Sequence, residues 1–237
     1  MKAMIFAAGF GTRFKPWTDK HPKALALVNG RSLLERNVTY LQQYGITELI
    51  INVHHFAEQI IQAIDTHKGW GSSITISDET GAILETGGGL KKAGWYFDKE
   101  PFVVINVDIL TDLNLQWMIN AHLKTGPLAT LAVTSRNTSR YFLFDQDNTL
   151  CGWRNIKTGE EKPDGLVPDL IQKAFSGVHV IDPRIFPLMP QTGRFSIVDS
   201  YLELSKTQII MGFDHSESKL VDVGKPQSVI EAEKLFP

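Results

Sequence analysis

Two kinds of segment, which differ in their pattern of apolar and polar residues, alternate along this chain. Short apolar runs rich in β-branched side chains have the length of buried strands. The segments between them repeat apolar residues every three or four positions, as amphipathic helices do. We expect strands at residues 3–8, 49–53, 74–76, 102–107, 128–133, 175–181, 209–213 and 220–223. This alternation of strand-like and helix-like segments predicts an α/β fold.

Helix signals separate the expected strands. Ser32 and Glu35 form a capping box before an apolar stripe that ends at Gly45. Pro226 opens a last helix, and further helices are expected at 56–67, 90–95, 115–124 and 198–206. The glycine-rich segment 86–89 is interpreted as a turn that leads into the helix at 90–95. Asp112 precedes the helix at 115–124 and is interpreted as a turn former or helix cap.

Residues 141–165 differ from the rest of the chain. Apolar and polar positions alternate there, and Asp147-Asn148 and Lys157-Thr158-Gly159 carry turn signals. We expect hairpins that form a small antiparallel flap. Because no internal repeat, low-complexity tract or linker interrupts the sequence, we expect residues 1–237 to form one domain.

The most specific chemical signal follows the first strand. Gly9-Phe10-Gly11-Thr12 supplies a loop of small residues, and Arg13 and Lys23 add positive charge. Glycines let backbone N–H groups approach an anion closely. The sequence therefore predicts a phosphate-rich ligand at the end of the first strand. A simple strand-to-helix turn would explain the glycines, but neither Arg13 nor the Pro22-Lys23 pair.

Two widespread phosphate loops do not fit this segment. The nucleoside-triphosphatase loop needs Gly-x-x-x-x-Gly-Lys-Ser/Thr, which does not occur. The dinucleotide fingerprint needs a third glycine, and Phe14 stands in its place. The loop therefore belongs to another class of phosphate-binding protein.

Two aspartates are candidates for a metal site. Asp108 follows the apolar strand at 102–107, where open α/β sheets bind ligands, although strand ends also carry aspartate in turns. Asp222 lies among apolar strand residues, where an unpaired carboxylate is costly, and could alternatively cap the last helix. Two carboxylates together with triphosphate oxygens would make an all-oxygen site suited to Mg²⁺.

Composition and charge exclude several classes of protein. With 43% hydrophobic residues, 21% charged residues and a formal net charge of −2, the chain has no bulk attraction to nucleic acid or an anionic membrane. Cys151 is the only cysteine, which excludes an intramolecular disulfide and a cysteine-based metal site. The first apolar run is too short for a transmembrane helix and lacks a signal-peptide pattern, so we expect a cytoplasmic protein.

The motifs together resemble those of the sugar-nucleotide pyrophosphorylases, the nucleotidyltransferases that activate sugar 1-phosphates. The resemblance comprises Gly-x-Gly-Thr-Arg-x-x-Pro-x-Thr with Pro22-Lys23, the strand-end Asp108, the Asp-x-Gly-x-Pro motif at 222–226 and the Glu-Thr-Gly-Gly-Gly run at 85–89. It implies a Rossmann-like three-layer α/β/α fold of the GT-A-like class, with a mostly parallel mixed sheet. Residues 1–135 would form the nucleotide-binding half, and residues 136–237 the sugar-binding half with the flap.

The resemblance also implies substrates and a cofactor. The chain looks most like N-acetylmuramate 1-phosphate uridylyltransferases, which favours UTP and N-acetylmuramate 1-phosphate as substrates and Mg²⁺ as cofactor. Guanylyl transfer to mannose 1-phosphate and cytidylyl transfer remain open. So do a glycosyltransferase that uses a finished nucleotide-sugar and a non-catalytic nucleotide-sugar sensor. We expect no nucleic-acid or membrane partner, and either a monomer or a homodimer.

Site roles transfer from the family by matching positions. Arg13, Lys23 and Asp108 would be catalytic, and Asp108 and Asp222 would hold the metal. The nucleotide would contact Ala8, Gly9, Gly11, Thr12, Arg13, Glu79, Thr86, Gly87 and Asn106. The sugar phosphate would contact Lys23, Glu161, Lys162, Gly177 and Asp199. The Glu161-Lys162-Pro163 segment could equally be a turn exposed to solvent. Val107 departs from the family, which usually has glycine before the metal aspartate.

Overall fold

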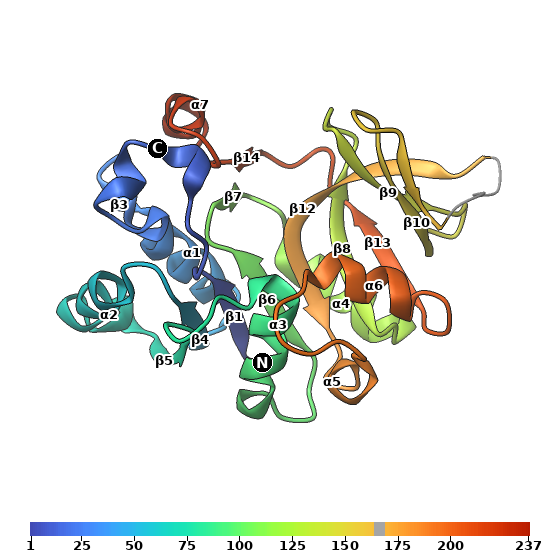
Figure 1. Cartoon of the computed structure of the whole chain (residues 1–237), viewed down its shortest axis with the longest axis horizontal. Coiled ribbons are helices and arrows are strands. Elements are labelled where there is room, and N and C mark those ends of the chain that lie inside the picture. Colours follow the sequence, from blue (N-terminus) through green and yellow to red (C-terminus); the bar gives the residue numbers. More distant parts are fainter. Residues whose placement is uncertain (164–168) are drawn as a thin grey trace.

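The computed structural model describes residues 1–163 and 169–237. Within them, a ten-stranded mixed sheet forms the centre of the molecule (Figure 1). Its parallel half consists, in spatial order, of β6 (Phe102–Asn106), β1 (Ala3–Phe6), β4 (Glu48–Val53) and β5 (Ser73–Asp78). Phe6, the last residue of β1, pairs with Asn52 on one side and Asn106 on the other. The carboxyl ends of these strands therefore meet at one edge of the sheet.

The other half of the sheet reverses direction. It contains β12 (Ile171–Ile181), antiparallel to β6 and to β8 (Ala129–Thr134), and β13 (Ile210–Asp214), parallel to β8. The start of β12 pairs with an antiparallel flap made of β9 (Arg140–Phe144), β10 (Leu150–Asn155) and β11 (Glu160–Lys162). The flap lies where the sequence predicts it, and its expected end at Gly165 falls outside the described residues.

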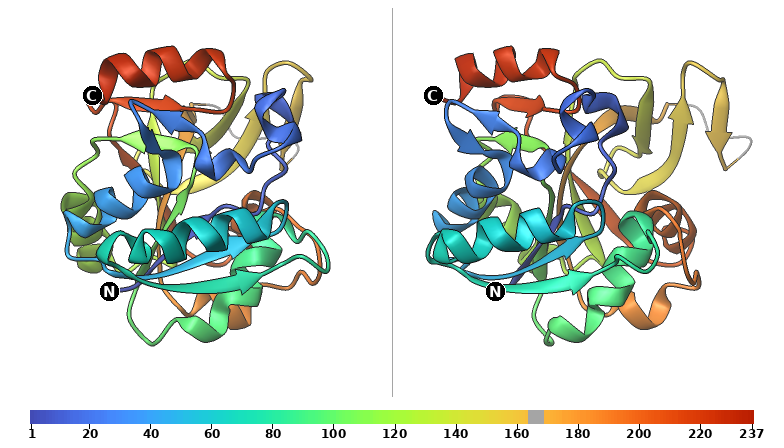
Figure 2. Two further views of the ribbon diagram at one scale, coloured as in Figure 1. Left: turned by 90° about the vertical axis from the view of Figure 1, so that its left-hand side faces the viewer. Right: turned by 60° about the vertical axis from the view of Figure 1, so that its left-hand side comes forward.

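Two apolar cores lie on opposite faces of the sheet. Ala3 and Ile5 of β1 join one core, which is covered by α1 (Leu33–Gln42), α2 (Ala57–Thr66), α4 (Leu115–Thr125) and α7 (Gln227–Leu235). Met4 and Phe6 join the other core, with α3 (Glu85–Lys92), α5 (Ile185–Leu188) and α6 (Ile197–Leu204). Because alternate residues of one strand enter different cores, the predicted three-layer α/β/α architecture is confirmed (Figure 2).

The glycine-rich segment is not a turn, contrary to the prediction. Residues 87–89 lie inside α3, and all three glycines are buried. A Cβ on Gly87 would collide with the Phe195 ring, and a Cβ on Gly88 with the carbonyl oxygen of Gly193. The glycines therefore let the helix backbone pack directly against the segment before α6, and this packing overrides their poor helix propensity.

The predicted capping role of Asp112 is also wrong. The N-cap of α4 is Asn114, whose side chain accepts a hydrogen bond from the Trp117 N–H. Asp112 Oδ1 instead accepts a hydrogen bond from the Lys219 N–H, which links the segment before α4 to a distant part of the chain.

In the described parts of the chain, no helix is both long and apolar enough to cross a membrane.

Candidate active site

One pocket, with a volume of about 380 Å³, lies at the carboxyl edge of the parallel strands. The loop after β1, the ends of β4 and β6, and the first residues of α3 form its walls. The lining residues are Phe6, Ala7, Ala8, Gly9, Gly11, Thr12, Arg13, Lys23, Asn52, Ile83, Glu85, Thr86, Asn106, Val107, Asp108 and Gly224. This is the edge at which open α/β sheets bind their ligands.

The glycine loop is held from both ends. The Ala7 N–H donates a hydrogen bond to Asn52 Oδ1 at 2.8 Å, which fixes the chain as it leaves β1. Gly11 has a φ of +61°, and a Cβ there would lie 2.9 Å from Thr18 Cγ2 and 3.1 Å from Lys23 Cβ. Thr18 Oγ1 also donates to the Gly11 carbonyl oxygen at 2.9 Å. Only glycine satisfies both the conformation and the close approach at position 11.

Lys23 and Asp108 form an ion pair inside the pocket. Their side chains are only 11% and 20% exposed, respectively. Lys23 begins a short turn of 3₁₀ helix (Lys23–Leu25), and Asp108 closely follows β6. Each charge is compensated by the other at a position that is open to a ligand, so an anionic substrate can recruit Lys23 and a cation can recruit Asp108.

A second, two-stranded sheet brings Asp222 next to Asp108. It pairs β7 (Ile109–Thr111) with β14 (Leu220–Asp222), so that Asp222 lies opposite Ile109. The Val223 N–H donates to the carbonyl oxygen of Asp108 at 2.8 Å. Residues that are more than a hundred positions apart thus converge beside the pocket.

The Asp222 carboxylate is only partly compensated. Its Oδ1 is buried and has no hydrogen-bond partner within the described residues. Burial raises the pKa of Asp222, and the negative charge of Asp108 raises it further, against the opposing effects of Lys23 and Arg13. Gly224 leaves room for this arrangement, because a Cβ there would lie 2.7 Å from Asp222 Oδ1 and 3.1 Å from an Arg13 guanidinium nitrogen.

These two aspartates fit a hard divalent cation. An uncompensated buried carboxylate oxygen next to a second carboxylate is the environment that a cation stabilises. In the described part of the chain, no cluster of three or more His, Cys, Asp or Glu side chains could hold a metal. The remaining ligands of a cation at Asp108 and Asp222 would therefore be oxygen atoms of water, of the substrates, or of nearby carbonyl groups.

The expected site residues fall into those that line the pocket, those that lie directly behind it and those that lie elsewhere. The pocket lining contains Ala8, Gly9, Gly11, Thr12, Arg13, Lys23, Thr86, Asn106 and Asp108. Three more lie immediately behind it: Asp222 beside Gly224, Gly87 in α3, and Gly177, whose missing Cβ would lie 2.7 Å from Asn106 Nδ2. Glu79 does not line the pocket. It is 1% exposed, and its carboxylate accepts hydrogen bonds from Asn52 Nδ2 and the Leu84 N–H.

Three of the residues expected near the sugar, Glu161, Lys162 and Asp199, lie elsewhere. Lys162 Nζ is 3.4 Å from Asp199 Oδ1, and both side chains line a separate hollow of about 600 Å³ beside the flap. Glu161 is paired with Arg154 Nε at 2.5 Å across the flap. The structure thus brings Lys162 and Asp199 together, outside the pocket of the glycine loop.

Several lining residues were not predicted from the sequence. Asn52 lies at the end of β4 as Asn106 does at the end of β6, and this shared position is the signal that could have revealed it. Gly224 belongs to the Asp-x-Gly-x-Pro motif but carries no chemistry of its own. Val107, the departure from the family pattern, is 6% exposed and packs into the apolar core. Its carbonyl oxygen accepts a hydrogen bond from Asn37 Nδ2 at 2.9 Å, which fixes the peptide before Asp108.

The chain resembles known proteins in sequence and in fold. The N-acetylmuramate α-1-phosphate uridylyltransferase of Caulobacter vibrioides is 30% identical over 98% of this chain and 95% of its own length. That of Neisseria meningitidis serogroup B is 41% identical over 198 residues, which are 78% of this chain and 77% of the relative. A solved UDP-glucose pyrophosphorylase from Acinetobacter baumannii shares the fold, with a TM-score of 0.79 at 18% identity over 98% of this chain and 91% of that one.

The family model of the nucleotidyl transferases matches residues 2–236, nearly the whole chain. The match includes the glycine loop, both aspartates and the segment that lines the pocket from α3. This chain therefore belongs to the nucleotidyl transferase family.

Proposed function

We propose that this protein joins UTP to N-acetylmuramate 1-phosphate, forming a nucleotide-sugar and releasing pyrophosphate. The observation that carries the proposal is the convergence of the glycine loop, Arg13, Lys23 and Asp108 on one pocket. The names of the two uridylyltransferase relatives support the choice of base and sugar.

The reaction is an in-line substitution at the α-phosphate of the nucleotide. An oxygen of the sugar phosphate attacks the α-phosphorus, and the bond to the β-phosphate oxygen breaks as pyrophosphate leaves. Such reactions need positioning and charge stabilisation more than covalent participation by the protein. The pocket supplies both, through backbone N–H groups of the glycine loop and the side chains of Arg13 and Lys23.

Each charged residue has a distinct task in this proposal. Arg13 stabilises the β- and γ-phosphates that depart. Lys23 exchanges its contact with Asp108 for the phosphates, and so holds the sugar phosphate against the α-phosphate. Asp108 and Asp222 would hold Mg²⁺, which supplies charge neutralisation on the phosphate oxygens when it is bound.

A covalent route through the cysteine has little support. Cys151 lies in β10 of the flap and does not line the pocket. Burial raises the pKa of its thiol, which lowers the fraction of reactive thiolate at neutral pH. We therefore propose direct transfer between the two bound substrates.

The test is pyrophosphate release with Mg²⁺ across a grid of substrates. UTP, GTP, CTP, ATP and dTTP are each combined with the 1-phosphates of N-acetylmuramic acid, mannose, glucose and N-acetylglucosamine. We expect the highest rate with UTP and N-acetylmuramate 1-phosphate. If the highest rate is found with GTP and mannose 1-phosphate, the proposed substrates are wrong but the proposed reaction stands. No pyrophosphate in any combination, with nucleotide binding retained, would favour a sensor.

A further inference from the structure

A buried carboxylate ties together the two walls of the nucleotide pocket. Glu79 follows β5 and is 1% exposed. Its Oε1 accepts a hydrogen bond from Asn52 Nδ2 at 2.8 Å, and its Oε2 accepts one from the Leu84 N–H at 3.3 Å. The two donors come from β4 and from the residue before α3, so one side chain spans two elements that do not adjoin in sequence.

Asn52 extends this connection to the glycine loop. It is 2% exposed, and its Oδ1 accepts the hydrogen bond from the Ala7 N–H at 2.8 Å. Its amide group therefore accepts a hydrogen bond from the loop and donates one to Glu79. At the other end, Leu84 lies between Ile83 and Glu85, which both line the pocket. The chain Ala7–Asn52–Glu79–Leu84 thus sets the glycine loop relative to the start of α3.

The surrounding structure leaves this pair little freedom to move. A Cβ on Gly89 of α3 would lie 2.6 Å from Glu79 Oε1 and 2.9 Å from Asn52 Nδ2. The glycine therefore admits the two polar side chains against the helix backbone. In so closely packed a position, a change in either side chain is transmitted to its neighbours.

The hydrogen-bond pattern explains why a carboxylate occupies the position. A carboxylate accepts with both oxygens, whereas a glutamine offers one acceptor and one donor group. Both neighbours of Glu79 are donors, so glutamine would leave two donors facing each other. Burial raises the pKa of Glu79, and the contacts with Asn52 and Leu84 oppose this rise, in keeping with their preference for the ionised form.

We infer that Glu79 is a positioning residue that sets the affinity for the nucleotide through Asn52 and Leu84 without touching the substrate. The inference rests on the proposed function, because it takes the pocket beside the glycine loop to be the nucleotide site. It predicts an effect on the nucleotide and not on the sugar 1-phosphate, since the hydrogen bonds of Glu79 and Asn52 lead to the glycine loop and α3, away from the flap.

Exchanging the carboxylate at position 79 with the amide at position 52 tests this inference. Glu79→Gln places an amide against the donor of Asn52 or Leu84, and Asn52→Asp places a carboxylate against Glu79. The double variant restores every bond, because the new carboxylate at position 52 accepts from Ala7 and from the new amide at position 79, and the carbonyl oxygen of that amide accepts from Leu84. We expect each single variant to raise the KM for UTP about tenfold, and the double variant to return it to within about threefold of the wild type.

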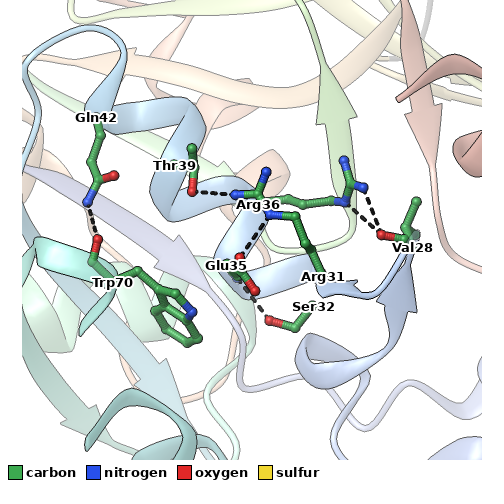
Figure 3. Close-up of polar contacts among 8 residues, drawn as sticks. All are labelled: Val28, Arg31, Ser32, Glu35, Arg36, Thr39, Gln42 and Trp70. Atoms are coloured by element: carbon green, nitrogen blue, oxygen red, sulfur yellow. Dashed lines mark hydrogen bonds and ion pairs between the residues drawn. The ribbon is translucent and has the colours of Figure 1, made fainter. Parts of the chain in front are cut away.

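The KM for the sugar 1-phosphate is the internal reference and should stay within about twofold in all three variants. Gln42→Glu is the matched control. Gln42 Nε2 in α1 donates to the Trp70 carbonyl oxygen at 2.8 Å (Figure 3), and neither residue lines the pocket. This variant should lower the melting temperature, as Glu79→Gln does, and leave both KM values unchanged.

Calorimetric dissociation constants for UTP, measured on the same proteins, separate this inference from the proposed function. A wild-type protein that binds UTP but releases no pyrophosphate contradicts the proposed function, and the dissociation constants still test the positioning role. Equal UTP affinity in all variants, equal changes in both KM values, or a double variant weaker than either single one would overturn the inference.

Discussion

The pocket of the glycine loop and the hollow beside the flap hold their charged residues in different ways. Lys23 and Asp108 are 11% and 20% exposed, and their side chains form an ion pair with each other inside the pocket. Lys162 and Asp199 are 46% and 51% exposed, 3.4 Å apart, at the edge of the flap. The first pair is built into the end of the central sheet, and the second lies on the surface.

This difference in exposure indicates that the two regions contribute differently to the reaction. Charges held rigidly in a partly buried site stabilise a transition state without reorganising, whereas exposed ion pairs contribute little because water screens them. We expect the chemistry to depend strongly on the first pair, and the choice of sugar to depend weakly on each of several groups near the flap. Four predictions test this contrast.

Loss of a charge from the glycine-loop pocket should have the largest effect. Lys23→Ala and Asp108→Asn should each lower kcat for pyrophosphate release about 100- to 1,000-fold, because each removes a charged group aimed at the reacting phosphates. Lys2→Ala is the control, since Lys2 pairs with Asp98 at 2.8 Å, remote from the pocket. Near-normal turnover of either pocket variant would remove the role assigned to that residue.

The contact between α3 and the segment before α6 joins the two regions, and it should resist any added side chain. Gly88→Ala introduces a Cβ against the Gly193 carbonyl oxygen and should destabilise the protein by about 1–3 kcal/mol in urea unfolding. An exposed helical glycine would instead gain roughly 1 kcal/mol from the same change. Gly81→Ala has open space around its Cβ and serves as the reference. A stabilised Gly88→Ala variant would mean that this contact is not close.

Acid should weaken the half of the molecule that contains β8, β12 and β13. Burial lowers the pKa of His122 to about 4, of His179 to about 3 and of His215 to about 4. Their pKa in the unfolded chain is about 6.5, so below that pH the unfolded state takes up protons that the native state refuses. The stability they contribute is complete above about pH 6.5 and is lost as the pH falls toward 4.

Each of these histidines should reduce the free energy of unfolding by about 1 kcal/mol per pH unit between roughly pH 6.5 and 4.5. Urea titrations at several pH values measure the slope. His122→Gln should flatten it by about one third, since one of three comparable groups no longer titrates. A stability that stays constant over this range would contradict the assignment of these histidines as neutral.

Removal of the exposed lysine at the flap should have the smallest effect. Lys162→Ala should raise the KM for the sugar 1-phosphate by about two- to fivefold and leave the KM for UTP unchanged, because an exposed ion pair contributes at most about 1 kcal/mol. Steady-state kinetics with each substrate varied in turn makes the distinction. A loss comparable to that of Lys23→Ala would erase the contrast between the two regions.

The sequence predicted most of the parallel half of the fold, because local signals specify it. The apolar runs at β1, β4 and β6 and the capping box before α1 depend on neighbouring residues alone. The glycines of α3 gave a wrong prediction because the reason for them is Phe195 and Gly193, which are distant in sequence. Local patterns cannot report a contact whose other half lies a hundred residues away.

The site divides in the same way. Arg13, Lys23 and Asp108 could be placed in one pocket from the sequence because their motifs are contiguous. The position of Asn52 in the pocket wall, and of Glu79 behind it, depends on a hydrogen-bond chain across β1, β4 and α3 that the sequence does not reveal. The proximity of Asp222 to Asp108 depends on the pairing of β7 with β14, which no spacing in the sequence specifies.

Isotope exchange between labelled pyrophosphate and UTP tests whether the nucleotidyl group passes directly between the two substrates in the glycine-loop pocket. We predict that label enters UTP only when N-acetylmuramate 1-phosphate or its nucleotide-sugar is present with Mg²⁺, and that Lys23→Ala lowers the exchange as strongly as it lowers turnover. Exchange in the absence of both sugar compounds would reveal a covalent nucleotidyl-enzyme and contradict direct transfer. No exchange under any condition, including with the other bases and sugars, would contradict nucleotidyl transfer itself.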